Sequence, residues 1–370
     1  MSLVIKSFGS VILIIIITIS LIFFIDFFLG KKIIKLIKNN KDNKHLLVTR
    51  EKPTIKNNQY KYNFKKNLNQ KAFYIRDYTI CTNKISLRVD CEDENKDNLN
   101  YDILFIGDSF TEGVAQPYKK TFVGIFEEKV KFRVGNLAVS SYSPYVYYNK
   151  IKAYSKKINF NNLSEVIVFI DISDVEDDIK TNSQINNNEI VISSDINNDK
   201  IKKFNLVVIK TFLKKQFPIS YELAFNIKNY NLPSPKYRYV KKYPRSAWTY
   251  NKNFVDFDVQ RGVDLNIYHM TKLYDFLKSY NVKLSIAVYP WPNTLLYDQA
   301  SSKQVKIWKN FCVNRCSSFI NYFPIFFEGK EKLELNEAKK IIKKFYMKGD
   351  MHFNILGNKK ISDKLIKLYK

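Results

Sequence analysis

Two short segments near opposite ends of the chain carry the residue types of nucleophilic catalysis. The first, GDSFTEG (107–113), follows the apolar run ILFI and places Ser109 on a turn between a predicted strand and a helix. A serine in this position has an exposed hydroxyl and a backbone N–H directed into the cleft, so it can serve as both nucleophile and oxyanion donor. On this segment alone, Asp108 or Ser109 could equally be a simple helix cap.

A serine nucleophile needs a base, and the chain has three histidines. His45 lies in a polar N-terminal tract, and His269 lies within a predicted helix. His352 lies in KGDMHFN, two residues after Asp350, whose carboxylate could fix the tautomer of the imidazole and stabilise its charged form. The sequence therefore predicts Ser109 as nucleophile, His352 as general base and Asp350 as its orienting partner, with a surface Asp-x-His turn as the alternative.

The elements that must position these residues alternate between strands and helices. This pattern predicts an α/β fold of three layers with a doubly wound parallel sheet of the flavodoxin-like kind, whose carboxyl edge binds ligands. The predicted strands are 102–106, 132–136, 165–170, 283–289 and 319–321, and the predicted helices are 119–130, one opened by Pro144, 263–280, 299–311 and 354–369. Between 175 and 261 the alternation fails, which predicts an insertion that is either a lid or a passive elaboration.

The N-terminus predicts a membrane anchor. Residues 7–29 are apolar apart from a single charge, Asp26, and are long enough to cross a bilayer as a helix. A cleaved signal peptide fits less well, because no small-x-small site follows. Residues 30–100 are expected to form a membrane-proximal linker and an N-terminal extension, and residues 101–370 the α/β domain.

The charge balance does not indicate nucleic-acid binding. The 370 residues include 61 Lys+Arg against 35 Asp+Glu, a formal net charge of +26, but 53 of the basic residues are lysine. A Lys- and Asn-rich composition is what an AT-rich coding sequence gives, and no dense basic block or nucleic-acid module is present. A basic surface favours anionic membranes or acidic glycans instead.

The spacing of the four cysteines helps to predict the cellular compartment of the domain. Cys81 and Cys91 are ten residues apart, Cys312 and Cys316 four, which suits either two local disulfides or four buried thiols. Neither spacing is typical of zinc, and we expect no metal. Six lysines between 31 and 44 would keep the domain in the cytoplasm by the positive-inside rule, but lysine is dense throughout the chain. Disulfides favour an extracytoplasmic domain, periplasmic or at the cell surface.

The same segments resemble the sequence blocks of the SGNH, or GDSL, hydrolase superfamily. GDSFTEG is similar to the first block and GDMHFN to the last, which implies the roles of Ser109, His352 and Asp350 given above. NLAVSS (136–141) stands where the family has Asn-x-x-x-x-Gly, with Ser141 at the glycine. DISD (171–174) stands where the family has Gly-x-Asn-Asp, with Ser173 at the asparagine.

The resemblance implies an oxyanion hole made by Ser109, Ser141 and Ser173. Ser141 can donate through its backbone N–H if the turn tolerates a side chain, whereas Ser173 offers a hydroxyl in place of a longer amide. Loss of one oxyanion donor costs about 2.7–4 kcal/mol of barrier in well-studied enzymes. A catalytically degenerate glycan-binding or assembly protein therefore stands as an alternative.

The last block also narrows the class of reaction. Asp-x-His followed by Phe353 is similar to membrane-linked polysaccharide O-acetyltransferases, and TNKISLR (82–88) resembles extracytoplasmic members found with cell-surface glycan synthesis. This implies an esterase or O-acyltransferase that acts on acyl, most simply acetyl, groups of an envelope polysaccharide, without a cofactor and with polysaccharide-assembly proteins as partners. A membrane-lipid esterase is the other alternative.

Three further residues are candidate substrate contacts. Asp108 adjoins the nucleophile, and YPWPN (289–293) leaves a predicted strand at the edge that faces the cleft. Tyr289 and Trp291 could stack on a sugar ring, or they could pack into the core as part of a rigid turn.

Overall fold

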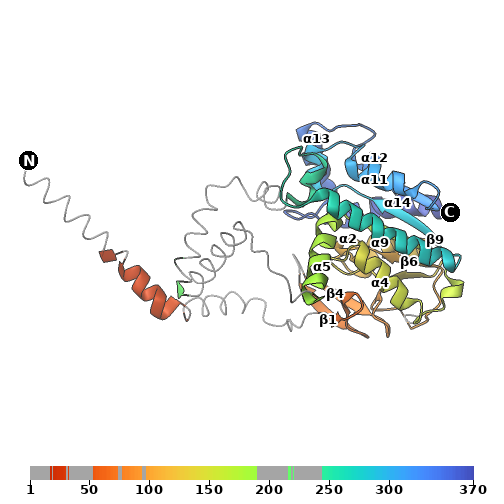
Figure 1. The fold of residues 1–370 in the computed structure, drawn as a ribbon, viewed down its shortest axis with the longest axis horizontal. Helices are drawn as coiled ribbons and strands as arrows, with labels where there is room; N and C mark the ends of the chain where they lie inside the picture. The colour runs from red at the N-terminus through yellow and green to blue at the C-terminus, as the bar shows by residue number, and fades with distance from the viewer. Residues whose placement is uncertain are drawn as a thin grey trace, which may run out of the picture. The chain divides into compact units, whose positions relative to one another are not determined.

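The structure, a computed structural model, describes residues 17–18, 20–30, 32, 53–73, 77–93, 97–189, 216–217, 220 and 244–370. The contacts within the chain divide it into two units. One comprises residues 1–49 with 190–234, and the other comprises residues 50–189 with 235–370. The second unit contains all the strands drawn in Figure 1.

In the first unit, residues 17–18, 20–30 and 32 are helical, and most of their apolar side chains are exposed. The Asp26 carboxylate is buried and accepts a 2.5 Å hydrogen bond from the backbone N–H of Ser220. The ring of Phe217 packs edge-on against that of Phe23, with centroids 5.5 Å apart. No helix in the described part of the chain is long and apolar enough to cross a membrane, and the predicted anchor at 7–29 lies partly outside that part.

The second unit is built on an eight-stranded sheet of order β10-β9-β8-β6-β7-β5-β4-β3. Five strands are parallel: β6 (Ile103–Ile106), β7 (Val134–Asn136), β8 (Glu165–Ile170), β9 (Lys283–Val288) and β10 (Ser318–Asn321). Three strands extend the sheet antiparallel beyond β7: β5 (Arg88–Val89), β4 (Asp77–Thr82) and β3 (Asn69–Phe73). A separate hairpin joins β1 (Thr54–Asn57) to β2 (Lys61–Phe64).

The parallel strands have the predicted doubly wound order. Strand β6, first of the five along the chain, lies between β7 and β8, so the strand order reverses there. Ligands bind outside the carboxyl ends of the strands at such a switch point. The apolar runs of β6 and β8 are buried along their whole length, as expected for strands covered on both faces.

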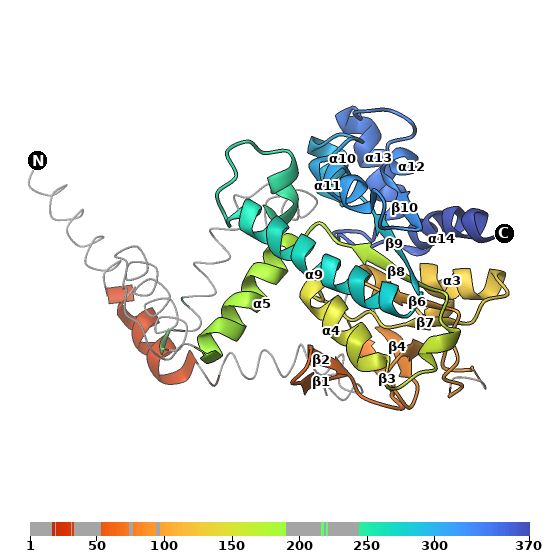
Figure 2. The same ribbon diagram turned by 45° about the vertical axis from the view of Figure 1, so that its right-hand side comes forward.

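Helices cover the sheet in two layers. Right-handed crossovers carry the helix after β6 to one face and the helices after β7 and β8 to the other. Accordingly α3 packs with α14, while α4 and α5 pack with α9, and the two groups lie apart in Figure 2. The helices are α2 (Ser109–Glu112), α3 (Phe122–Lys129), α4 (Pro144–Tyr154), α5 (Asp174–Glu189), α9 (Val259–Ser279), α10 (Pro292–Tyr297), α11 (Lys303–Cys312), α12 (Phe323–Phe326), α13 (Leu335–Phe345) and α14 (Ile355–Tyr369), with 3-10 turns η2 (Tyr118–Lys120), η3 (Phe160–Asn162) and η4 (Pro244–Thr249).

Two expected boundaries differ from the structure. The α/β unit begins well before residue 101, because β3, β4 and β5 pair into the main sheet. The expected insertion at 175–261 is also narrower, since α5 runs to Glu189 and η4 and the start of α9 belong to the α/β unit. The rest of the expected insertion, whether a lid or a passive elaboration, lies mostly outside the described residues.

Candidate active site

The nucleophile turn follows β6 directly. Asp108 caps α2 by accepting a 2.9 Å hydrogen bond from the backbone N–H of Phe110, and Ser109 is the first residue of that helix. At Gly107 a Cβ would lie 2.3 Å from Oγ1 of Thr111, so the turn has no room for a side chain there. The Ser109 side chain is partly exposed, which leaves its hydroxyl open to a substrate.

The predicted base and its partner lie in the turn before α14. The turn is closed by hydrogen bonds from Met347 N to the His352 carbonyl and from Asp350 N to the Met347 carbonyl, at 2.9 and 3.1 Å. Phe353 then stacks on Phe326, with ring centroids 5.4 Å apart, which fixes the turn to the core. Asp350 and His352 are both 5% exposed.

The three predicted catalytic residues form one hydrogen-bonded chain. Nε2 of His352 lies 2.8 Å from Oγ of Ser109, and Nδ1 of His352 lies 2.5 Å from Oδ1 of Asp350. The same carboxylate oxygen accepts the backbone N–H of His352 at 2.8 Å. Both partners of the imidazole are therefore in place for proton transfer from the serine hydroxyl.

The predicted oxyanion donors follow the two strands that flank β6. Ser141 lies in the loop after β7, is exposed, and has a φ of +60°. This left-handed conformation is the one that glycine adopts readily, which fits a position where the resembling family has glycine. Ser173 follows β8; its backbone N–H donates to Asp171 at 2.8 Å and its carbonyl accepts from Arg245 at 3.1 Å.

The candidate sugar contacts are buried. Tyr289 is 0% exposed and Trp291 3%, and their O–H and indole N–H donate to Oδ2 of Asp171 at 2.8 and 2.7 Å. Tyr289 also approaches Asp108 at 3.2 Å. The geometry fits the alternative in which YPWPN packs its aromatic rings into the core.

Asp108 is likewise buried rather than open to a substrate. Burial, together with the nearby Asp171 carboxylate, raises the pKa of Asp108 well above its usual range. Its Oδ2 lies 3.1 Å from Oγ of Ser109. The Ser109 hydroxyl can donate its proton either to this oxygen or to Nε2 of His352, so Asp108 competes with the imidazole for that hydrogen bond.

The acidic residues at the start of α5 are paired inside the protein. Arg245 forms ion pairs with Glu176 and Asp177, the latter at 2.7 Å. Asp178 accepts hydrogen bonds from the Tyr145 backbone and the Asn266 side chain at 3.1 and 2.9 Å. Among the residues that the structure describes, no group of His, Cys, Asp and Glu side chains could hold a metal ion.

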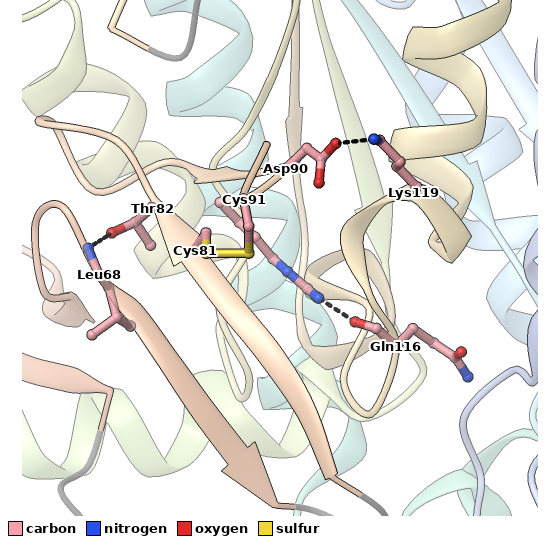
Figure 3. Close-up of a disulfide and its surroundings, with 8 residues drawn as sticks. Leu68, Cys81, Thr82, Asp90, Cys91, Gln116 and Lys119 are labelled. Carbon is pink, nitrogen blue, oxygen red and sulfur yellow. Dashed lines mark hydrogen bonds and ion pairs between the residues drawn. A yellow bond between two sulfur atoms is a disulfide. The ribbon is translucent and has the colours of Figure 1, made fainter. Parts of the chain in front are cut away.

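Arg88 is a site-supporting residue whose role the sequence did not predict. It is 1% exposed, and its guanidinium donates to the carbonyls of Glu112 and Gln116, the second at 2.5 Å. These carbonyls lie at the end of α2 and just beyond it, so an N-terminal strand fixes the chain that follows the nucleophile. The Cys81–Cys91 disulfide joins β4 to the residues after β5, beside this contact (Figure 3). Arg88 is the last residue of TNKISLR (82–88), but nothing in that segment indicates that its side chain binds the carbonyls at the end of α2.

Comparisons with known proteins give structural similarities only. No protein-family model and no curated protein matches the chain. Similar solved structures include TesA (8% identity, TM-score 0.38, 72% of this chain and 97% of the other) and a member of the lipolytic G-D-S-L family from Veillonella parvula (13%, 0.36, 72% and 97%). An acetylxylan esterase from Geobacillus stearothermophilus is also similar (10%, 0.33, 73% and 94%). Similarities at these TM-scores carry no argument about function.

Proposed function

We propose that this protein is a serine esterase or O-acyltransferase of the SGNH type. The observation that carries the proposal is the hydrogen-bonded chain Ser109–His352–Asp350 at the carboxyl end of β6, where the strand order reverses. Nucleophile, base and orienting carboxylate are the three groups that acyl transfer requires. The order of the sequence blocks, with Ser109 in the first and His352 in the last, supports the same assignment.

The reaction begins when His352 Nε2 takes the hydroxyl proton of Ser109 as Oγ forms a bond to the ester carbonyl carbon. The carbonyl electrons move to oxygen, where the N–H groups of Ser109 and Ser141 and the hydroxyl of Ser173 stabilise the charge. The tetrahedral intermediate collapses, the C–O bond to the alcohol breaks, and His352 protonates the departing alkoxide. Asp350 stabilises the imidazolium in between.

The acyl-enzyme is then resolved by an acceptor hydroxyl. His352 takes the proton of water in an esterase, or of a sugar hydroxyl in an O-acyltransferase, and returns it to Ser109 as the acyl group leaves. We propose a glycan of the cell surface or envelope as the substrate, with an acetyl ester as the bond. The sequence resemblance to membrane-linked polysaccharide O-acetyltransferases supports this assignment.

We further propose that the α/β unit works outside the cytoplasm, tethered through residues 7–29. Two disulfides, Cys81–Cys91 and Cys312–Cys316, join all four cysteines. Disulfides of this kind persist in oxidising compartments. The apolar sequence at 7–29 has the length of a bilayer-spanning helix.

The test is turnover of p-nitrophenyl acetate by the full chain in detergent. We expect Ser109→Ala to abolish p-nitrophenol release, because the nucleophile is gone, and Ser279→Ala, at an exposed position of α9, to leave it unchanged. Addition of an oligosaccharide separates the two reactions, because acetyl transferred to sugar identifies an O-acyltransferase. Equal rates for Ser109→Ala and the wild type would refute the proposal.

A further inference from the structure

One peptide group of the site is held by residues outside the three catalytic positions. The peptide group between Ser140 and Ser141 is planar, so its C=O and N–H lie in one plane and point in opposite directions. Its N–H is the proposed oxyanion donor of Ser141. Its C=O accepts a hydrogen bond from the phenolic hydroxyl of Tyr62. Whatever fixes the direction of this carbonyl therefore fixes the direction of the donor.

The other two polar groups of Ser140, its backbone N–H and its hydroxyl, are hydrogen-bonded as well. Its backbone N–H and its hydroxyl both donate to Oε2 of Glu112, each at 2.6 Å. Glu112 belongs to the nucleophile segment and is 3% exposed. The loop after β7 is thus tied to α2 on one side and to β2 on the other, and Ser141 leaves it with a left-handed φ of +60°.

Tyr62 is itself firmly placed. The hydroxyl of Tyr142 donates to the Tyr62 carbonyl at 2.5 Å, and the two rings lie 5.6 Å apart. The ammonium of Lys150, fully buried, binds Tyr142, Leu137 and Asn63 at 3.1, 2.7 and 2.8 Å, which docks β2 onto α4. Burial also raises the pKa of Tyr62 above its ordinary value, so its hydroxyl stays protonated and remains a donor.

We propose that Tyr62 is a positioning residue for the oxyanion hole, acting with Glu112 to hold the Ser140–Ser141 peptide so that its N–H faces the reacting carbonyl. This inference rests on the proposed function. It explains how a serine can stand where the resembling family has glycine: two side chains impose the backbone conformation that a glycine reaches unaided. A hydrogen bond to the C=O also polarises the N–H of the same peptide.

The experiment compares Tyr62→Phe with Tyr369→Phe in the full chain. Tyr369→Phe is the control, since the Tyr369 hydroxyl donates to Oε2 of Glu165 at 2.8 Å, at the start of β8 and away from the carboxyl ends of the strands. We measure kcat and KM for p-nitrophenyl acetate and for its thionoester, in which sulfur replaces the carbonyl oxygen. Because sulfur accepts hydrogen bonds weakly, the ratio of the ester rate to the thionoester rate reports the oxyanion donors.

We expect Tyr62→Phe to lower kcat for the ester about tenfold, below the 10²- to 10³-fold of a deleted donor, with KM within about twofold. The ester-to-thionoester ratio should fall by a similar factor. Glu112→Gln should move kcat and the ratio in the same direction, whereas Tyr369→Phe should change neither.

Two outcomes would overturn the inference, and they are distinguishable. If the wild type shows Ser109-dependent turnover but Tyr62→Phe matches Tyr369→Phe in both kcat and the ratio, the proposed function stands and the positioning role is wrong. If Ser109→Ala turns over as fast as the wild type, the proposed function fails and the positioning role fails with it.

Discussion

Substitution of Asp350 tests how the carboxylate contributes to the site. One oxygen, Oδ1, accepts both the ring N–H of His352 at 2.5 Å and its backbone N–H at 2.8 Å. Asp350→Asn can keep an oxygen in this place, so it removes the charge while retaining the hydrogen bonds. Asp350→Ala removes the hydrogen bonds as well. The pair of variants separates the electrostatic contribution from the orienting one.

The magnitude follows from the distance. A carboxylate and an imidazolium whose charge centres are about 4 Å apart interact by about 4 kcal/mol at an effective dielectric of about 20. Since about 1.4 kcal/mol corresponds to a factor of ten, we expect Asp350→Asn to lower kcat about 10²- to 10³-fold. Asp350→Ala should lower it about tenfold further, because the imidazole also loses its orientation. KM should change little, since Asp350 is 5% exposed and does not contact substrate.

The assay is steady-state hydrolysis of p-nitrophenyl acetate by the full chain. Asp363→Asn, at an exposed ion pair with Lys359 on α14, is the control and should retain the wild-type kcat. A wild-type kcat in Asp350→Asn would refute the electrostatic argument, and equal losses in the Asn and Ala variants would refute the orienting one.

Three further predictions concern the rest of the molecule. Ser141→Gly should keep kcat within about twofold in turnover assays, because the proposed donor is a backbone N–H. Ser141→Val should lower the free energy of unfolding by about 1–2 kcal/mol, measured by thermal unfolding, because the residue has a left-handed φ. Burial lowers the pKa of His269 to about 4, so the unfolded chain binds more protons below pH 6.5, and stability should fall by about 3 kcal/mol between pH 6.5 and 4. When urea titrations measure the free energy of unfolding at several pH values, His269→Phe should lose this dependence on pH. An unchanged dependence in the variant would contradict the prediction. Replacing Cys81 and Cys91 with serine should lower the free energy of unfolding by about 2.7 kcal/mol for a loop of about ten residues, and an unchanged urea midpoint would contradict it.

The sequence predicted the parallel half of the sheet well because its central strands, such as β6 and β8, are unbroken or nearly unbroken apolar runs. The buried run EVIVFI was expected at 165–170 and forms β8 (Glu165–Ile170). Strands β3 and β4 were not predicted, because polar residues such as Asn69, Lys71 and Thr79 leave no apolar run, and β5 has only two residues. Helix α13 (Leu335–Phe345) was missed as well, although its apolar residues recur at helical spacing.

The candidate site likewise has one part that the sequence predicted and one part that it did not. The triad was predicted because Ser109, Asp350 and His352 carry their chemistry in their side chains and lie in short motifs. The contacts that hold the Ser140–Ser141 peptide were not predictable, since they depend on a positive φ at Ser141 and on a hydrogen bond from a hairpin about 80 residues earlier. Such contacts form between residues that the sequence does not connect by any pattern.

The separation of Ser109 and His352 along the chain, 243 residues, also sets when the proposed acyl transfer can begin during synthesis. At about 5–20 residues per second, the ribosome adds the base roughly 10–50 s after the nucleophile. During that interval Ser109 lacks the proposed base, so we expect that a growing chain that ends before residue 352 does not attack esters. The connectivity thus delays the proposed activity until the turn that carries His352 has been made.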